Sequence, residues 1–148
     1  MKAVIQRVLN AELKVDGKLI SKIDKGMVVF LGVKVGDSEV DVEKIGKKIS
    51  KLRIFEDENE KMNLSIKDTQ GEILLVSQFT LYGDCTHGNR PSFIMAERPE
   101  KANELYLKMK EFLLNEDIPV QTGVFGADMK IDALNDGPVT ILMDSEEL

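Results

Sequence analysis

The sequence predicts an α+β fold: a single small domain in which a mostly antiparallel sheet closes into a barrel-like core beside two main helices. Its 148 residues are 43% hydrophobic and 31% charged, enough for one buried core. Short segments rich in β-branched residues come first and are joined as hairpins, and two later segments carry a helical apolar period. No repeat or Pro/Gly-rich linker divides the chain, so residues 1–148 are expected to form one domain.

The N-terminal third is expected to consist of strands. Residues 2–9 and 11–15 are rich in β-branched residues, and Asp16-Gly17 is typical of a hairpin turn that leads into a returning strand at 18–23. Residues 27–33, MVVFLGV, form an unbroken apolar run, which predicts a strand buried on both faces.

The first helix is predicted over residues 39–52. Ser38 is a suitable N-cap, with Asp41 three residues further on. One face is an apolar stripe, composed of Val42, Ile45, Ile49 and Leu52. The opposite face is basic, composed of Lys44, Lys47, Lys48 and Lys51. A solvated helix face and a surface that contacts RNA both remain open interpretations of these lysines.

The rest of the chain alternates between loops, strands and a second helix. Residues 56–63 are polar and loop-like, whereas 72–81, EILLVSQFTL, begin as a buried strand. Residues 83–92 are expected to be a loop, and 99–114 a helix opened by Pro99. Short strands separated by glycine-containing turns are predicted at 118–122, 128–134 and 138–143.

Composition restricts the classes of function. The net charge of −6 and the pI of about 4.9 argue against broad non-specific nucleic-acid binding, although a local basic patch remains compatible. No apolar stretch is long enough to span a membrane, and the N-terminus lacks the pattern of a signal peptide. Cys85 is the one cysteine, so no intrachain disulfide forms and a cytoplasmic location is expected.

Several familiar catalytic motifs are absent. There is no Walker loop, no GxGxxG after a strand and no HExxH, and a single histidine excludes a His-rich metal site. We therefore expect neither a metal nor another cofactor. His87 and Cys85 are two residues apart in the predicted loop 83–92. A catalytic dyad there is conceivable, but an exposed loop histidine is the favoured interpretation.

Two polar constellations remain as candidates. Ser77, Gln78, Phe79 and Thr80 follow the apolar EILLV segment, so they either cap the sheet or present N–H groups and a hydroxyl to a ligand. The segment Asn135–Thr140, NDGPVT, is expected to be a tight turn between two strands. A cis Gly137-Pro138 bond there would turn its carbonyls in a shared direction for backbone recognition. Met129 alone favours a core position.

Across essentially its whole length, the sequence resembles the D-aminoacyl-tRNA deacylase family of the bacterial and eukaryotic type. The strongest matches are SQFTL at Ser77–Leu81 and NDGPVT at Asn135–Thr140. Glycine is usual in the family where Glu60 stands. The other matching segments are AVIQRV, MVVFLGV, LRIFEDENEKMNLS, GNRPSF at Gly88–Phe93 and QTGVFGADM at Gln121–Met129.

The resemblance implies a homodimeric hydrolase that removes D-amino acids, and also glycine, from tRNA. It places the active site at the subunit interface, where the SQFTL strand end of one subunit meets a cis Gly-Pro segment of the other. Arg7 would hold the Gly-Pro carbonyls. The site residues transferred on this basis serve catalysis (Ser77, Gln78, Phe79, Thr80), binding and chiral selection (Arg7, Met129, Asn135, Gly137, Pro138, Thr140) and tRNA contact (Lys44, Lys48, Lys51).

The mechanism expected from these residues uses backbone donors and not a protein nucleophile. N–H groups around Phe79 and Thr80 would stabilise the oxyanion, and the ribose 2′-hydroxyl would orient or activate water. A Thr80 nucleophile would need an adjacent base, and the sequence supplies none nearby. The alternative function is a non-catalytic RNA-binding module that shares the fold.

Overall fold

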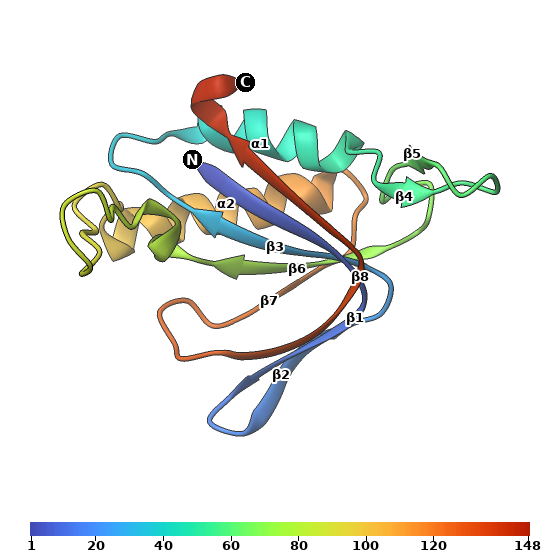
Figure 1. The fold of residues 1–148 in the computed structure, drawn as a ribbon, viewed down its shortest axis with the longest axis horizontal. Coiled ribbons are helices and arrows are strands. Elements are labelled where there is room, and N and C mark those ends of the chain that lie inside the picture. Colours follow the sequence, from blue (N-terminus) through green and yellow to red (C-terminus); the bar gives the residue numbers. More distant parts are fainter.

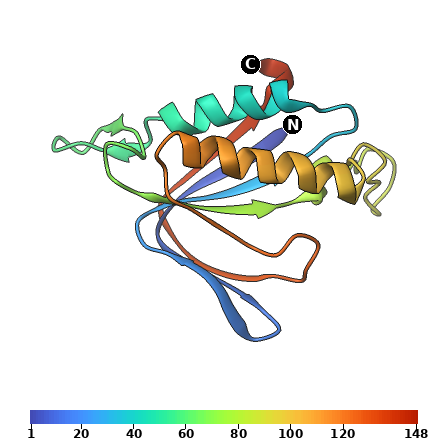
Figure 2. The same cartoon turned by 180° about the vertical axis from the view of Figure 1, so that it is seen from behind.

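The computed structural model describes residues 1–148 as a strongly curved six-stranded sheet with two helices across one face (Figures 1 and 2). The sheet order is β2-β1-β3-β6-β7, and β8 pairs with the outer side of β1. This arrangement confirms the predicted α+β fold with a sheet nearly closed into a barrel. The strands of the sheet are β1 (Lys2–Val15), β2 (Lys18–Ile23), β3 (Gly26–Gly32), β6 (Glu72–Ser77), β7 (Val120–Thr122) and β8 (Lys130–Asp144).

The remaining elements surround this sheet. They are helices α1 (Glu39–Lys51) and α2 (Pro99–Asn115), the small hairpin β4 (Phe55–Glu56) and β5 (Met62–Leu64), and the 3-10 helices η1 (Phe79–Tyr82) and η2 (Ser145–Glu147). None of the helices has the length and apolar character that a bilayer crossing requires. Pairing is antiparallel except where β6 lies parallel to β3 and to β7, because α1 and α2 lie within the two connections.

The core has two parts because β3 and β6 are covered on both faces. Met27 and Val29 on β3 face the helices, where they pack with Ile45 of α1 and Met109 of α2. Val28, between them, faces the inside of the curved sheet with a second apolar cluster. The apolar run at 27–33 is therefore a strand buried on both faces, as predicted.

Helix α1 begins where its cap was predicted. Ser38 accepts a hydrogen bond from the Val40 N–H, and the Asp41 carboxylate accepts one from the Ser38 N–H. Helix α2 begins at Pro99, also as predicted.

Three boundaries differ from the sequence-based expectation. Residues 2–9 and 11–15 form one strand, β1, because its first part pairs with β3 and its second with β2. The segments at 128–134 and 138–143 likewise form one strand, β8, so the expected tight turn at Asn135–Gly137 is wrong. The polar segment at 56–63 also contains part of the β4–β5 hairpin.

The strand β8 passes through the Gly-Pro segment as a bulge. Its pairing with β1 shifts register between Gln6 and Val8 and again between Val8 and Asn10. The extra residues that the sequence indicated as a turn are accommodated inside a continuous strand.

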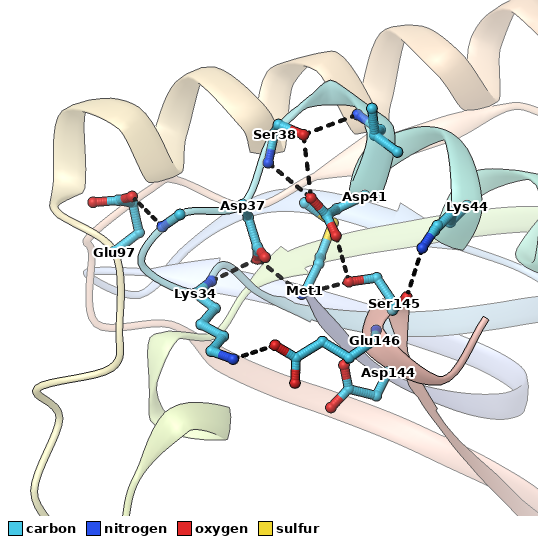
Figure 3. Close-up of polar contacts among 12 residues, drawn as sticks. Met1, Lys34, Asp37, Ser38, Asp41, Lys44, Glu97, Asp144, Ser145 and Glu146 are labelled. Carbon is cyan, nitrogen blue, oxygen red and sulfur yellow. Dashed lines mark hydrogen bonds and ion pairs between the residues drawn. The ribbon is translucent and has the colours of Figure 1, made fainter.

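The two chain ends are joined by a polar network (Figure 3). The α-ammonium of Met1 is buried, lies 2.8 Å from Asp37 Oδ2 and donates to Ser145 Oγ at 2.8 Å. The Ser145 hydroxyl in turn donates to Asp41 Oδ1 at 2.7 Å, and Lys44 Nζ donates to the Ser145 carbonyl at 3.2 Å. These contacts fix β1, η2 and the first turns of α1 to one another.

Candidate active site

A cavity of about 620 Å³ opens where β6 ends. Its walls come from the ends of β3 and β6, the start of α2 and the loop before β8. Twelve of its nineteen lining residues are hydrophobic, and Ser77, Gln78 and Phe79 are among the polar and aromatic ones. A mostly apolar cavity with a few polar groups at one end is the usual form of a small-molecule site.

The SQFT segment provides unused hydrogen-bond donors at the edge of this cavity, which Ser77, Gln78 and Phe79 line and the exposed Thr80 does not. The Gln78 N–H donates to the Leu31 carbonyl at 2.8 Å and so pairs with the end of β3. The N–H groups of Phe79 and Thr80, which begin η1, have no acceptor within the chain, as is general for the first residues of a helix. Two adjacent free N–H groups can bind one oxygen atom.

The Thr80 hydroxyl is oriented as a donor. Gln78 Nε2 donates to Thr80 Oγ1 at 2.5 Å, so the hydroxyl proton is free to point toward a ligand. Phe79 is 57% exposed and makes an edge-to-face contact with Phe93, with ring centroids 5.0 Å apart. The segment therefore presents donors beside an aromatic surface.

The two carboxylates that line the cavity, Glu97 and Asp128, form no hydrogen bond with Thr80. Asp128 Oδ1 instead lies 3.0 Å from Lys130 Nζ. The carboxylate of Glu97 accepts hydrogen bonds from the Arg98 N–H at 2.8 Å and the Gly36 N–H at 3.3 Å. The first of these bonds is the main reason that the pKa of Glu97 is lowered. His87 and Cys85 are exposed in the loop beyond η1 and do not line the cavity.

The Gly-Pro segment is anchored by Arg7. The Gly137-Pro138 bond is cis, and Gly137 has φ +120°. The buried Arg7 donates through Nη1 to the Ile54 carbonyl at 2.7 Å and through Nε to the Asp136 carbonyl at 3.3 Å. Arg7 Nε also lies 3.1 Å from the Asp136 carboxylate. The guanidinium thus holds the residue that precedes Gly137; a hydrogen bond to the Gly137 or Pro138 carbonyl is not formed.

The two constellations lie far apart within one chain. Residues of β8 on either side of Gly137 pair with Gln6 and Val8 of β1, and Arg7 between them is in register with Met27 of β3 and hence with Ile73 of β6. From Ile73 to Ser77 is about 13 Å along the strand, and from β8 to β6 is about 14 Å across it, so the separation is about 20 Å. One small ligand cannot contact both segments of a single chain.

The other transferred residues are distributed between these places. Met129 lines the cavity, whereas Asn135 and Thr140 are exposed on β8 beside the Gly-Pro segment. Lys48 and Lys51 are exposed and form no ion pair, Lys47 pairs with Glu43, and Lys44 is half-buried against Ser145.

Sequence reasoning did not single out Tyr106, which forms part of the cavity wall. Its hydroxyl donates to the Leu75 carbonyl at 2.7 Å, and burial raises its pKa to about 12. Tyr106 lies four residues after Ala102 on the buried stripe of α2, and that spacing could have identified it.

The chain is similar over nearly its whole length to proteins of one family. A family model described as D-Tyr-tRNA(Tyr) deacylase matches residues 4–144. A D-aminoacyl-tRNA deacylase from Fusobacterium nucleatum is 54% identical over 147 residues, which cover 99% of this chain and 97% of that protein. A D-aminoacyl-tRNA deacylase from Persephonella marina is 56% identical over 148 residues, with both chains fully covered.

Solved structures agree with the fold. One described as c-Myc DNA Unwinding Element Binding Protein superposes with a TM-score of 0.91 at 42% identity, covering 97% of this chain and 98% of that one. Another, described as a probable eukaryotic D-amino acid tRNA deacylase, gives a TM-score of 0.79 at 17% identity, covering 96% and 97%. At that identity the second match supports the fold alone.

Proposed function

Because the chain belongs to the D-Tyr-tRNA(Tyr) deacylase family, it is a D-aminoacyl-tRNA deacylase, and we propose that two copies of the chain complete each of its active sites. The SQFT cavity of one copy would receive the Gly-Pro segment of the other. The observation that carries this proposal is the separation of about 20 Å between the two segments within one chain.

Exposed apolar side chains on β8 and β1 support the pairing of two copies. Leu134 and Leu142 of β8 are 53% and 77% exposed, and Leu9 of β1 is 46% exposed. The strand β8 is also a sheet edge, with one side of its backbone unpaired. An isologous dimer would cover this surface and create two equivalent sites. A light-scattering mass of one chain at micromolar concentration, together with full activity, would contradict the proposal.

The proposed chemistry is water attack on the ester carbonyl. The free N–H groups of Phe79 and Thr80 would hold the developing oxyanion, and electrostatic stabilisation of this kind is usually the largest single contribution to catalysis. The ribose 2′-hydroxyl of the tRNA would orient or activate the water. Thr80 would donate its hydroxyl proton to the substrate and would not attack it, in keeping with the hydrogen bond that it accepts from Gln78.

The proposed basis of chiral selection is steric. The carbonyls of Gly137 and Pro138 would bind the α-amino group and leave no space for an L side chain, while a D side chain would point outward. Asn135 and Thr140 would border the same pocket from β8, and Met129 would form its apolar wall in the other copy. Because glycine has no side chain, glycyl-tRNA would also be accepted.

Lysines of α1 are the proposed contacts for tRNA phosphates in the cytoplasm. Lys48 and Lys51 are exposed and unpaired, so reversing both to Glu should weaken tRNA binding and flatten its dependence on salt. Lys44 is a poorer choice for this experiment, since its bond to the Ser145 carbonyl gives it a structural role. An unchanged salt slope would place the RNA elsewhere.

The sequence leaves a nucleic-acid-binding module without catalysis as the alternative. The 42% identical structure bears on it, because its description as a DNA unwinding element binding protein names binding and no reaction. Hydrolysis of matched D-aminoacyl-, L-aminoacyl- and glycyl-tRNA by the purified chain separates the two functions. Release of D-amino acid and glycine with the L-ester intact supports the deacylase, and binding of all three without release supports the module.

A further inference from the structure

One guanidinium connects the Gly-Pro segment to the end of α1. Arg7 binds the Ile54 carbonyl and the Asp136 carbonyl, and its Nη2 lies 3.7 Å from the Glu56 carboxylate. Ile54 follows the last residue of α1 by three positions, a reach of no more than about 11 Å. Arg7 therefore holds the chain just after α1 beside the residue that precedes the Gly-Pro bond.

This end of α1 carries unpaired cations. Lys48, Lys51 and Arg53 are exposed, and none forms an ion pair; we call them the α1-end cations. Arg53 uses only Nε internally, in a bond to the Asn63 carbonyl at 2.8 Å.

Some of the acidic residues that follow in the β4–β5 hairpin already interact with groups of the same chain. Glu56 is near Arg7, and Asp57 accepts bonds from the Asn59 and Lys61 N–H groups. Glu58 and Glu60 remain free in the turn between β4 and β5, so an RNA strand would follow α1 and avoid that turn.

The α1-end cations are remote from the cavity of their own chain. In both ribbon views, α1 ends beside β4 and β5, whereas η1 lies at the opposite end of the sheet (Figures 1 and 2). The strand register leads to the same conclusion. Arg7 is level with the start of β6, whereas the cavity lies at the C-terminal end of β6. In the two-copy site, the Gly-Pro segment of the partner would lie at the cavity and would bring the α1-end cations of its own chain with it. Those cations would then lie closer to the first phosphates of the bound tRNA than the cations of the chain that forms the cavity.

We propose that the α1-end cations bind the phosphates of the tRNA whose aminoacyl end occupies the cavity of the partner copy. The copy that contributes the Gly-Pro segment thus also holds the RNA backbone, and the copy that contributes the SQFT segment holds the ester. This inference rests on the two-copy site proposed above. The recognised chemistry is a phosphodiester backbone, contacted without regard to base sequence.

Hybrid dimers test the assignment. One chain carries Phe79→Pro, which removes an oxyanion donor at a position where proline suits a helix start. The other carries Gly137→Ala, which damages the Gly-Pro segment. The hybrid retains one complete site, formed by the cavity of the Gly137→Ala chain and the Gly-Pro segment of the Phe79→Pro chain. Differently tagged chains are co-expressed and purified in tandem.

The cation reversal Lys48→Glu with Lys51→Glu is then placed on one chain at a time. On the Phe79→Pro chain it should raise KM for D-aminoacyl-tRNA about tenfold at moderate salt and flatten the salt slope. On the Gly137→Ala chain it should leave KM within twofold. The control reversal is Lys14→Glu with Lys18→Glu, two exposed lysines without ion pairs near the β1–β2 turn, which should change KM on neither chain.

The outcomes separate the two levels of the proposal. A hybrid with no more activity than its parent homodimers contradicts the two-copy site itself. Three results with an active hybrid would overturn the assignment of the cations to the partner's substrate. The lysine reversal could change KM equally on both chains, it could change KM only on the Gly137→Ala chain, or the control reversal could change KM as much.

Discussion

Replacement of Gly137 by alanine tests the chiral selector most directly. Gly137 has φ +120°, a conformation that L residues rarely adopt. A Cβ at this position would lie 2.9 Å from Val139 Cγ2, 3.0 Å from the Val139 nitrogen and 3.3 Å from Arg7 Nη2. The added methyl group therefore presses on the segment and on the arginine that anchors it.

The expected magnitude follows from these contacts. A non-glycine residue in a sparsely populated backbone region costs about 1–3 kcal/mol. For a chain of this size, each kcal/mol lowers Tm by about 2–4 °C, so a fall of about 2–12 °C is expected if the segment keeps its conformation. If the segment instead relaxes, Tm falls less and the carbonyls move away from the amino group of the substrate.

Gly17 provides a matched control. It has φ +76°, and a Cβ there would meet nothing within 4 Å, so Gly17→Ala introduces backbone strain without contact at the selector. The assay compares hydrolysis of D- and L-aminoacyl-tRNA charged with the same amino acid, alongside thermal unfolding of both variants.

We expect Gly137→Ala to lose at least about tenfold in kcat/KM for the D-ester or to begin hydrolysing the L-ester, a change of about 1.4 kcal/mol or more. Gly17→Ala should lose stability with its D/L ratio unchanged. A Gly137→Ala variant that keeps the rate and the D/L ratio of the parent would refute selection by this backbone.

Three further changes test the cavity. Phe79→Pro deletes one oxyanion donor and should lower kcat by about a hundredfold to a thousandfold with little change in Tm, measured by single-turnover deacylation. Thr80→Ala should retain substantial activity; a loss beyond about a thousandfold, roughly 4 kcal/mol of barrier, with a trapped acyl-enzyme would restore the nucleophile. Tyr106→Phe removes the hydroxyl bond to Leu75 and should cost about 1 kcal/mol. The pKa of Tyr106 is about 12 in the folded chain against an ordinary 10.0, so the stability gained from its neutral hydroxyl is complete below pH 10 and declines as pH rises toward 12. The free energy of unfolding, measured by denaturant titration, should therefore fall less steeply between pH 10 and 12 for Tyr106→Phe than for the parent. Equal pH dependence of the two proteins would contradict the assignment.

Local signals in the sequence predicted the elements whose formation depends on neighbouring residues. The capping pair Ser38 and Asp41 located the start of α1, and the apolar run at 27–33 identified a strand covered on both faces. Glu60 is also informative: the resemblance implies glycine at this position, and Glu60 has φ +59° in the hairpin turn.

The errors arose where distant pairing overrides local preference. Asn135-Asp136-Gly137 has the composition of a tight turn, but pairing with β1 on both sides draws it into one bulged strand. Similarly, no local pattern revealed that Arg7 reaches Ile54 and Asp136, because those contacts cross 47 and 129 positions of the chain. The motifs named the residues of the candidate site, and the resemblance implied that they come from two subunits. The strand register adds the physical reason, which is the distance between the two segments within one chain.

The buried α-ammonium of Met1 has a practical consequence for work with this protein. A peptide fused ahead of Met1 would replace a charged group by a neutral amide with a single N–H, and the Asp37 carboxylate would lose its cation. Removing one member of a buried ion pair typically costs about 3–5 kcal/mol. Affinity tags are therefore better attached after Leu148, which is 41% exposed, and an N-formyl group left on Met1 would disturb the same contact.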